Sequence, residues 1–244
     1  MKELNFDSGV VTYRLNGKYE LECHDACGTL DDTPFPGGAY TQQSAKGLLL
    51  QIIDGDFEVE FEEGLADMNL TGIIQSGTKR QAMQPVLFAW GCCIATDGGE
   101  AIRVFRPSVE ATFIEKGRTY TGVTVETASV VTEVRVTAHT YTKSSDGSIE
   151  IAGEKYNDTE TVFTVKNPNV TATDKQNVIE ITGGTLVSSE IGQSVAQRVY
   201  DYYLKRNTNR AKIVWNGELL GDCVTLPNAW GDANTGNISK MEMK

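Results

Sequence analysis

Histidine is scarce in this chain, and its scarcity argues against the common kinds of hydrolytic catalysis. Only His24 and His139 occur among the 244 residues. A serine triad needs a histidine held between a nucleophile and a carboxylate, and neither histidine has an obvious partner near it in the sequence. The chain also lacks the Gly-x-Ser-x-Gly elbow of many hydrolases. We therefore expect no catalytic residues and a protein that is not an enzyme.

Long apolar runs and an excess of basic residues are also missing. No stretch approaches the ~18 apolar residues that a membrane helix needs, and the N-terminus, MKELNFDSGV, has no apolar core of the kind found in signal peptides. The net charge is −11, from 22 basic and 33 acidic residues. Because nucleic-acid binding depends on lysine and arginine neutralising phosphates, we expect no nucleic-acid partner. We also expect no membrane partner and synthesis in the cytoplasm.

The cysteines form no convincing metal or redox motif. An odd number in a long chain argues against a secreted disulfide framework, so we expect free, mostly buried thiols. The five are Cys23, Cys27, Cys92, Cys93 and Cys223. The motif Cys23-His24-x-x-Cys27 would need further ligands to hold a structural zinc ion, and the adjacent pair Cys92-Cys93 is poorly spaced to supply them. The glycines of 182–185 lack the lysine of a phosphate-binding loop. We expect no metal and no cofactor.

Acidic and aromatic side chains leave two further possibilities. Paired carboxylates could serve a glycosidase or bind calcium, but a solvated face is the simpler interpretation of Asp31, Asp32, Glu58, Glu60, Glu62 and Glu63. Aromatic rings could form a platform for glycans. Trp90 lies on an apolar helix stripe and Trp215 in a β-prone segment, so core packing is expected for both. Trp230, in the loop NAWGDANTG, is expected at the surface and is the candidate glycan contact.

The segment 78–91 has the pattern of a capped amphipathic helix. Thr78 and Gln81 have the spacing of a capping box, apolar residues follow at helical intervals, and Gly91 suits the left-handed position that ends a helix. Pro85 falls inside this helix, where it removes an amide donor and clashes one turn back. A kink, or a helix that begins near Pro85, is therefore predicted.

Other parts of residues 22–107 predict a compact α/β unit. A helical turn is expected at 24–30, followed by a loop, TPFPGGAY. Thr41 or Ser44 can cap the next helix, Gly55 ends it, and its buried stripe is Ala45, Leu48, Leu49, Ile52 and Ile53. Residues 57–62 alternate as a half-buried strand with an acidic outer face. β-Prone segments at 92–96 and 101–105 flank a Gly-Gly turn and predict a hairpin.

From residue 108 the pattern changes to β. Strands are expected within 119–127, 130–142, 161–165 and 178–182, with a hairpin tip at 143–147. A helix at 190–207 interrupts them, and its buried stripe is predicted to comprise Ile191, Val195, Val199, Tyr202 and Tyr203. The predicted fold class is α+β: a small β-barrel or rolled-sheet domain with one packed helix at 108–244, plus an α/β unit with two helices and a hairpin at 22–107.

Three stretches, residues 19–55, 78–107 and 194–244, resemble the tail-tip and baseplate hub proteins of tailed phages, including prophages of Gram-positive bacteria. The resemblance implies a virion tail location and a homotrimer around the tail axis. In that trimer small β-barrels would form a ring that contacts other tail and baseplate proteins. Members of this family normally have a further upstream segment. Residues 1–21, with an Asn16-Gly17 turn signal, are therefore expected to be a β-hairpin remnant of an incomplete N-terminal barrel.

The function expected from these observations is a structural, non-enzymatic subunit of a phage or prophage tail tip or baseplate hub, acting through subunit interfaces. Two alternatives stay open. One is a carbohydrate-binding module that contacts bacterial surface glycans, and the other is a degraded cell-wall hydrolase domain. Binding that is lost on Trp230→Ala would favour the first alternative, and turnover that is lost on changing His24 or His139 would favour the second.

Overall fold

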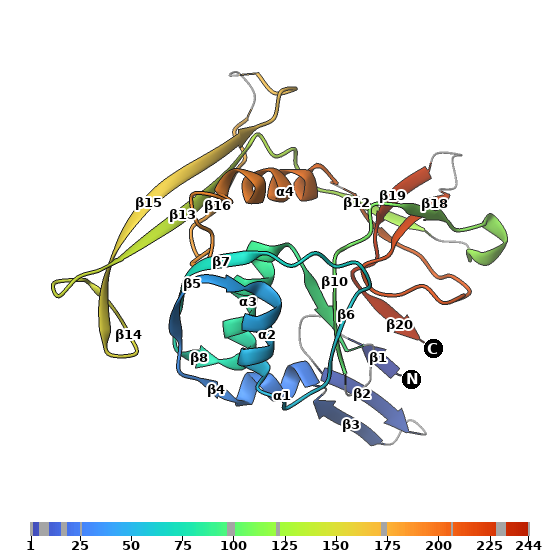
Figure 1. Ribbon diagram of the computed structural model, residues 1–244. Helices are drawn as coiled ribbons and strands as arrows, with labels where there is room; N and C mark the ends of the chain where they lie inside the picture. The colour runs from blue at the N-terminus through green and yellow to red at the C-terminus, as the bar shows by residue number, and fades with distance from the viewer. Residues whose placement is uncertain are drawn as a thin grey trace.

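The computed structural model describes residues 2–4, 10–15, 19–24, 26–96, 101–120, 123–171, 175–205, 207–227 and 233–243, with side chains from residue 26 to 242. The predicted α+β class is confirmed. Three helices pack with short strands in the first half of the chain, and curled sheets with one long helix make up most of the second half (Figure 1).

The first sheet joins strands from the two ends of the chain. Its strands are β1 (Lys2–Leu4), β2 (Val10–Leu15), β3 (Tyr19–His24) and β20 (Met241–Met243), in the order β20-β1-β2-β3. Leu15 pairs with Tyr19 in antiparallel register, so the strands of the predicted N-terminal hairpin are confirmed. The turn signal Asn16-Gly17 lies outside the described residues.

The helix α2 follows its sequence signals closely. Two helices precede the capped helix, α1 (Ala26–Asp32) and α2 (Ala45–Ile53). Of the two predicted caps, Ser44 is used, because its hydroxyl accepts the Gly47 amide at 2.9 Å. The predicted buried stripe is confirmed in full. The helix ends at Asp54 (φ 56°) and not at Gly55, because aspartate also tolerates the left-handed conformation.

The helix α3 (Lys79–Trp90) has the predicted capping box of Thr78 and Gln81 and the predicted left-handed cap at Gly91 (φ 79°). A start near Pro85 is wrong, since the helix begins six residues earlier in the chain and includes the proline. Contacts at the helix start explain this outcome. The Lys79 amide donates to the Thr33 carbonyl at 2.8 Å, and its buried ammonium donates to the Ile53 carbonyl and to Asp56.

Two short strand pairs were missed in the sequence. The segment predicted as a loop forms β4 (Pro34–Phe35) and β5 (Gly38–Ser44), which pair with β8 (Gly77–Thr78) and β7 (Asn69–Ile74) respectively. The pairing of β5 with β7 is interrupted by a bulge between Tyr40 and Gln43. These strands were not predicted because the region contains prolines and paired glycines, and both residue types are depleted in regular strands.

The predicted hairpin and acidic strand are confirmed. They form a sheet of β6 (Val59–Phe61), β9 (Cys93–Ala95) and β10 (Ile102–Phe105), in the order β6-β10-β9. Phe57, Val59 and Phe61 pack against the core, whereas the intervening glutamates are exposed. The turn 97–100 lies outside the described residues.

The largest sheet of the second half has the order β14-β15-β13-β16. Its strands are β13 (Glu133–Lys143), β14 (Ile149–Ile151), β15 (Glu154–Lys166) and β16 (Val178–Ile181). Helix α4 (Gly192–Leu204) packs on this sheet and is shorter than the predicted 190–207. The prediction that Tyr202 and Tyr203 lie on the buried stripe is wrong: their side chains are 71% and 36% exposed. The buried face is completed instead by Ala196 and Tyr200.

The remaining strands form two smaller curled sheets. One contains β11 (Ala111–Phe113), β18 (Cys223–Pro227) and β19 (Ala233–Asn237), and the other pairs β12 (Thr124–Thr127) with β17 (Asn207–Arg210). A short 3₁₀ helix, η1 (Lys116–Arg118), lies between β11 and β12 in the sequence. Among the described residues the strands of 108–244 therefore divide among separate sheets, and the rolled-sheet form of the prediction is the one observed.

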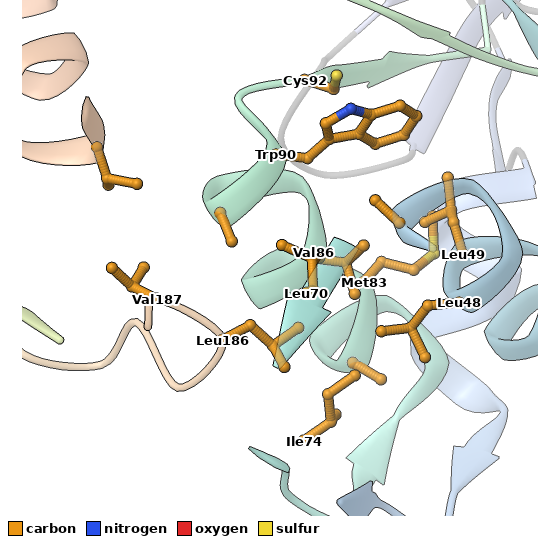
Figure 2. Close-up of a cluster of buried hydrophobic side chains, with 14 of the residues drawn as sticks. Leu48, Leu49, Leu70, Ile74, Met83, Val86, Trp90, Cys92, Leu186 and Val187 are labelled. Carbon is orange, nitrogen blue, oxygen red and sulfur yellow. The ribbon is translucent and has the colours of Figure 1, made fainter. Parts of the chain in front are cut away.

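One hydrophobic core extends on both sides of residue 107. It combines the buried faces of α1, α2 and α3 with those of β13 and α4. Leu186 and Val187, in the loop after β16, are fully buried members of this core, and Leu186 points toward Leu70 and Val86 (Figure 2). The predicted boundaries at 21/22 and 107/108 stay predictions. No helix in the described part of the chain is long and apolar enough to span a membrane.

Candidate functional site: the arm and the Trp215 turn

The tryptophans occupy different environments. Trp90 is 1% exposed, so its predicted core packing is confirmed. Trp215 is 55% exposed, and the prediction of core packing for it is wrong. Trp230, the candidate glycan contact, lies outside the described residues, and its role stays a prediction.

The most prominent feature is a long β-hairpin, residues 133–166, that we call the arm. Strands β13 and β15 pair without interruption from Glu133↔Lys166 to Lys143↔Tyr156. Figure 1 shows the arm projecting away from the helices, with β14 at its far end. The predicted strand at 161–165 is therefore only part of β15. The turn between β14 and β15 consists of Ala152 and Gly153, both with positive φ, and was not predicted.

The two faces of the arm differ in chemistry. Alternate residues Val134, Val136 and Ala138 are fully or almost fully buried and belong to the core beneath α4. The opposite face is polar, because successive strand residues point to opposite sides. There Arg135 bonds Glu133 at 2.5 Å and Glu180 at 2.8 Å. The arm is therefore anchored by its apolar face, whereas its polar face is exposed at Arg135 and buried at Thr137 and His139.

The arm also has an open edge. Strand β14 pairs with β15 only over residues 154–156. From residue 157 to 166, no described strand pairs with the outer side of β15. Val162 in this stretch is 55% exposed. Unpaired edge strands offer backbone donors and acceptors to another chain, so this edge is a candidate interface.

His139 lies on the polar face and has the partner that the sequence did not reveal. Its Nδ1 atom is 2.7 Å from Asp158 Oδ2, and its Nε2 atom is 2.9 Å from the Thr182 carbonyl oxygen. The ring is buried and stacks on Tyr141, with 5.8 Å between ring centroids. Burial, reinforced by the nearby Asp158 and Glu160 charges, raises the pKa of Tyr141 far above its usual value. The partner was missed because Asp158 is distant in sequence and adjacent only through the β13–β15 register.

A second presented surface is the turn 213–219, which we call the Trp215 turn. Arg118 donates to the Val214 carbonyl and forms an ion pair with the buried Glu218. Glu218 also accepts the Asn216 amide at 2.8 Å, and its own carbonyl accepts the Trp215 indole N–H at 2.8 Å. These bonds hold the turn closed while the Trp215 ring remains exposed.

Glu218 gives the turn a pH dependence. Burial would raise the pKa of Glu218, but hydrogen bonds from the Asn216 amide and from Arg118 outweigh burial and lower the pKa below its ordinary 4.5. The ionised form is therefore favoured by folding, and this stabilisation is present above pH 4.5 and is lost as the pH falls through the folded-state value.

Glu218→Gln is expected to lower the free energy of unfolding by about 1–2 kcal/mol at pH 7, because charge-assisted bonds to a buried group are weakened. The difference from wild type should shrink below about pH 4.5. Urea denaturation between pH 3 and 7 measures both effects. Glu115→Gln is the matched control, since Glu115 is exposed and its side chain makes no capping bond. A difference independent of pH would contradict the proposed role of the Glu218 charge.

The other sequence-predicted sites take the simpler interpretation. Glu58, Glu60 and Glu62 are exposed, and Asp31 forms an ion pair with Arg80 at 2.7 Å. The four cysteines with described side chains are free, and three are buried. Burial raises the pKa of the Cys92 and Cys93 thiols, which disfavours the thiolate form needed for redox chemistry or metal binding. The side chains of Cys23 and His24 are outside the described part.

The fold is similar to that of three solved tail proteins, two of which come from prophages. The 43 kDa tail protein of prophage MuSo2 from Shewanella oneidensis matches with a TM-score of 0.56 at 10% identity, covering 98% of this chain and 83% of that chain. Prophage tail protein gp18 from Listeria monocytogenes matches with 0.55 at 12% identity, covering 98% and 73%. A tail protein from Neisseria meningitidis matches with 0.55 at 13% identity, covering 93% and 70%.

The chain has the fold of these prophage tail proteins. The similarity lies in structure, because no protein-family model matches the sequence and no curated protein is significantly similar to it. A shared fold at 10–13% identity describes architecture and leaves the chemistry of the site to be argued from the residues themselves.

Proposed function

We propose that the chain is a non-enzymatic structural subunit of a phage or prophage tail, in the tail tip or baseplate hub. It acts through interfaces with copies of itself, as a homotrimer, and with other tail or baseplate proteins. It would be made in the bacterial cytoplasm and reside in the virion tail after assembly. The observation that carries the proposal is the shared fold over 93–98% of the chain.

The environment of His139 supports a role without catalysis. A general base needs one ring nitrogen free for the nucleophile while the other is oriented by a carboxylate. In His139 the second nitrogen, Nε2, faces the Thr182 carbonyl, so no ring nitrogen is left for a serine or cysteine. A hollow of about 410 Å³ beside the end of α4 is lined by Val131, Tyr200, Leu204 and their neighbours, with no histidine among them.

The open edge of the arm supports assembly through strand pairing. Adding a strand to an exposed sheet edge uses backbone hydrogen bonds and needs no distinctive side-chain motif. A ring of three copies requires a heterologous contact whose rotation closes. The open edge belongs to β15, and the Trp215 turn precedes β18; these two strands lie in different parts of the fold, as a head-to-tail contact requires (Figure 1).

Sedimentation equilibrium over a range of concentrations tests this proposal. We expect a trimer that is weakened by Val162→Lys, because a charge on an open edge opposes strand addition. Val109→Lys is the matched control: Val109 is 88% exposed and lies outside the arm. A chain that stays monomeric at all concentrations, alone and with tail proteins encoded beside it, would contradict the proposal.

The exposed ring of Trp215 favours one second candidate, a module that contacts bacterial surface glycans. An aromatic ring held by a closed turn provides a stacking surface at little entropic cost. Cell-wall pull-down that is lost on Trp215→Ala or Trp230→Ala, with unchanged sedimentation, would favour glycan binding. Turnover of peptidoglycan lost on His139→Gln would favour a hydrolase instead.

A further inference from the structure

The polar face of the arm brings together one imidazole and two carboxylates. The groups are His139 on β13 and Asp158 and Glu160 on β15, and their potential ligand atoms all lie within 4.8 Å of one another. His139 is opposite Glu160 in the strand register, and Asp158 is two residues along the same face. The sheet geometry therefore explains why these side chains meet.

The hydrogen bonds of His139 point to a cation between it and Asp158. A carbonyl oxygen can only accept, so Nε2 must carry the hydrogen that is donated to Thr182. In the neutral ring Nδ1 then has a lone pair, and it faces a carboxylate oxygen 2.7 Å away. Two acceptors at that distance repel unless a positive ion, a proton or a metal, lies between them.

Asp158 supplies an independent observation. Its other carboxylate oxygen, Oδ1, is buried and has no hydrogen-bond partner among the residues that the structure describes. A buried carboxylate oxygen without a partner is costly. The Asp158 side chain is only 18% exposed, so this cost is not relieved by free access to solvent. A coordinated metal ion would satisfy this group together with the lone pair on Nδ1.

We propose that His139, Asp158 and Glu160 bind a divalent first-row transition-metal ion. One imidazole nitrogen and two carboxylate oxygens suit zinc and its neighbours, with water completing a tetrahedral site. The bond from Nε2–H to the Thr182 carbonyl is the outer-shell contact that metal-bound histidines use to fix their orientation. Binding requires Nδ1 and Asp158 Oδ2 to separate to about 3.4 Å, which a change of the Asp158 side chain supplies. Glu160 is exposed, so a metal ion would reach the site from the side of this residue.

The metal would tie the arm to the body of the protein. Thr182 directly follows β16 and leads into the loop whose Leu186 and Val187 are buried in the core. The His139 amide donates to the Val187 carbonyl at 2.8 Å in the same region. An ion on His139 and β15 therefore fixes the arm relative to this loop, which goes beyond the proposed interface function of the arm edge.

Equilibrium dialysis of the whole chain against zinc, followed by elemental analysis, tests the proposal. We expect one zinc per chain, and binding weakened at least about tenfold in Glu160→Gln. Glu160 is exposed, so this variant retains the fold. Asp158→Asn should show an equal or larger loss. Glu150→Gln, an exposed change on β14, is the matched control and should bind as wild type does.

Cobalt distinguishes this site from the cysteines. Cobalt(II) held by nitrogen and oxygen ligands lacks the sulfur-to-metal charge-transfer absorption that thiolate ligands produce. We expect no such absorption, and d–d bands that disappear in the Asp158→Asn/Glu160→Gln double variant. Absence of stoichiometric binding would overturn the proposal. Unchanged binding in the double variant, or thiolate absorption, would also overturn it. The proposed tail function is measured by sedimentation and does not depend on this outcome.

Discussion

Gly72→Ala is expected to lower the free energy of unfolding by about 3–5 kcal/mol, through backbone strain and overpacking together. Gly72 lies in β7 with φ of 153°, a conformation that side chains disfavour. A Cβ atom there would collide with the Thr185 carbonyl oxygen and crowd the backbone of Leu186. Because both obstacles are backbone atoms, rotation of a side chain cannot relieve them.

Gly183→Ala is the matched control for this effect. Gly183 lies in the loop after β16, the same loop that contains Thr185 and Leu186. Its φ is unstrained, and a Cβ atom there would enter open space. We expect its stability to lie within about 0.5 kcal/mol of wild type. Urea denaturation compares the two variants, and hydrogen exchange of the Ile73 amide, which donates to Thr185 at 3.3 Å, reports the local contact. Equal stability of the two variants would show that the close approach at Gly72 does not matter.

Trp90→Ala is expected to cost about 4 kcal/mol, the range found for removing large buried aromatic side chains. Trp90 is 1% exposed, and its indole N–H donates to the Ala66 carbonyl at 2.9 Å. The substitution leaves both a cavity in the core and a carbonyl without its donor. Trp90→Phe should cost less, because the ring is largely replaced while the carbonyl still loses its partner.

Trp215→Ala makes the same chemical change at an exposed position and separates burial from residue type. We expect it to cost about 1 kcal/mol or less, because the ring is 55% exposed and contributes chiefly one hydrogen bond to the Glu218 carbonyl. Thermal and urea unfolding of the three variants provide the comparison. Similar losses at Trp90 and Trp215 would contradict the assignment of Trp90 to the core.

Local signals predicted the elements that depend on neighbours in sequence. The capping box at Thr78, the stop at Gly91 and the buried stripe of α2 are all confirmed. Each depends on interactions between residues that are no more than about one helical turn apart in the sequence. The hairpin of β9 and β10 is also confirmed, because its two strands are neighbours in the sequence. The α+β class follows from these elements and from the β-rich second half.

Long-range pairing decided the features that were missed. Strand β15 is longer than its apolar segment because β13 supplies partners for its polar residues, out to Tyr156. The contact between His139 and Asp158 arises from that register, so neither residue is distinctive alone. Trp215 is exposed because Arg118, distant in sequence, closes the turn beneath it. The candidate interface at the edge of β15 depends on unpaired backbone groups. No particular residue type marks such groups, so the sequence could not predict them.

The burial of Leu186 and Val187 against the first half of the chain has a consequence for biosynthesis. At 5–20 residues per second, a ribosome needs roughly 4–16 s to proceed from residue 107 to this loop. During that time the surface formed by Leu70 and Val86 lacks its cover. Nascent chains are therefore exposed to aggregation at this surface, and binding of a chaperone there would protect them until the later loop docks.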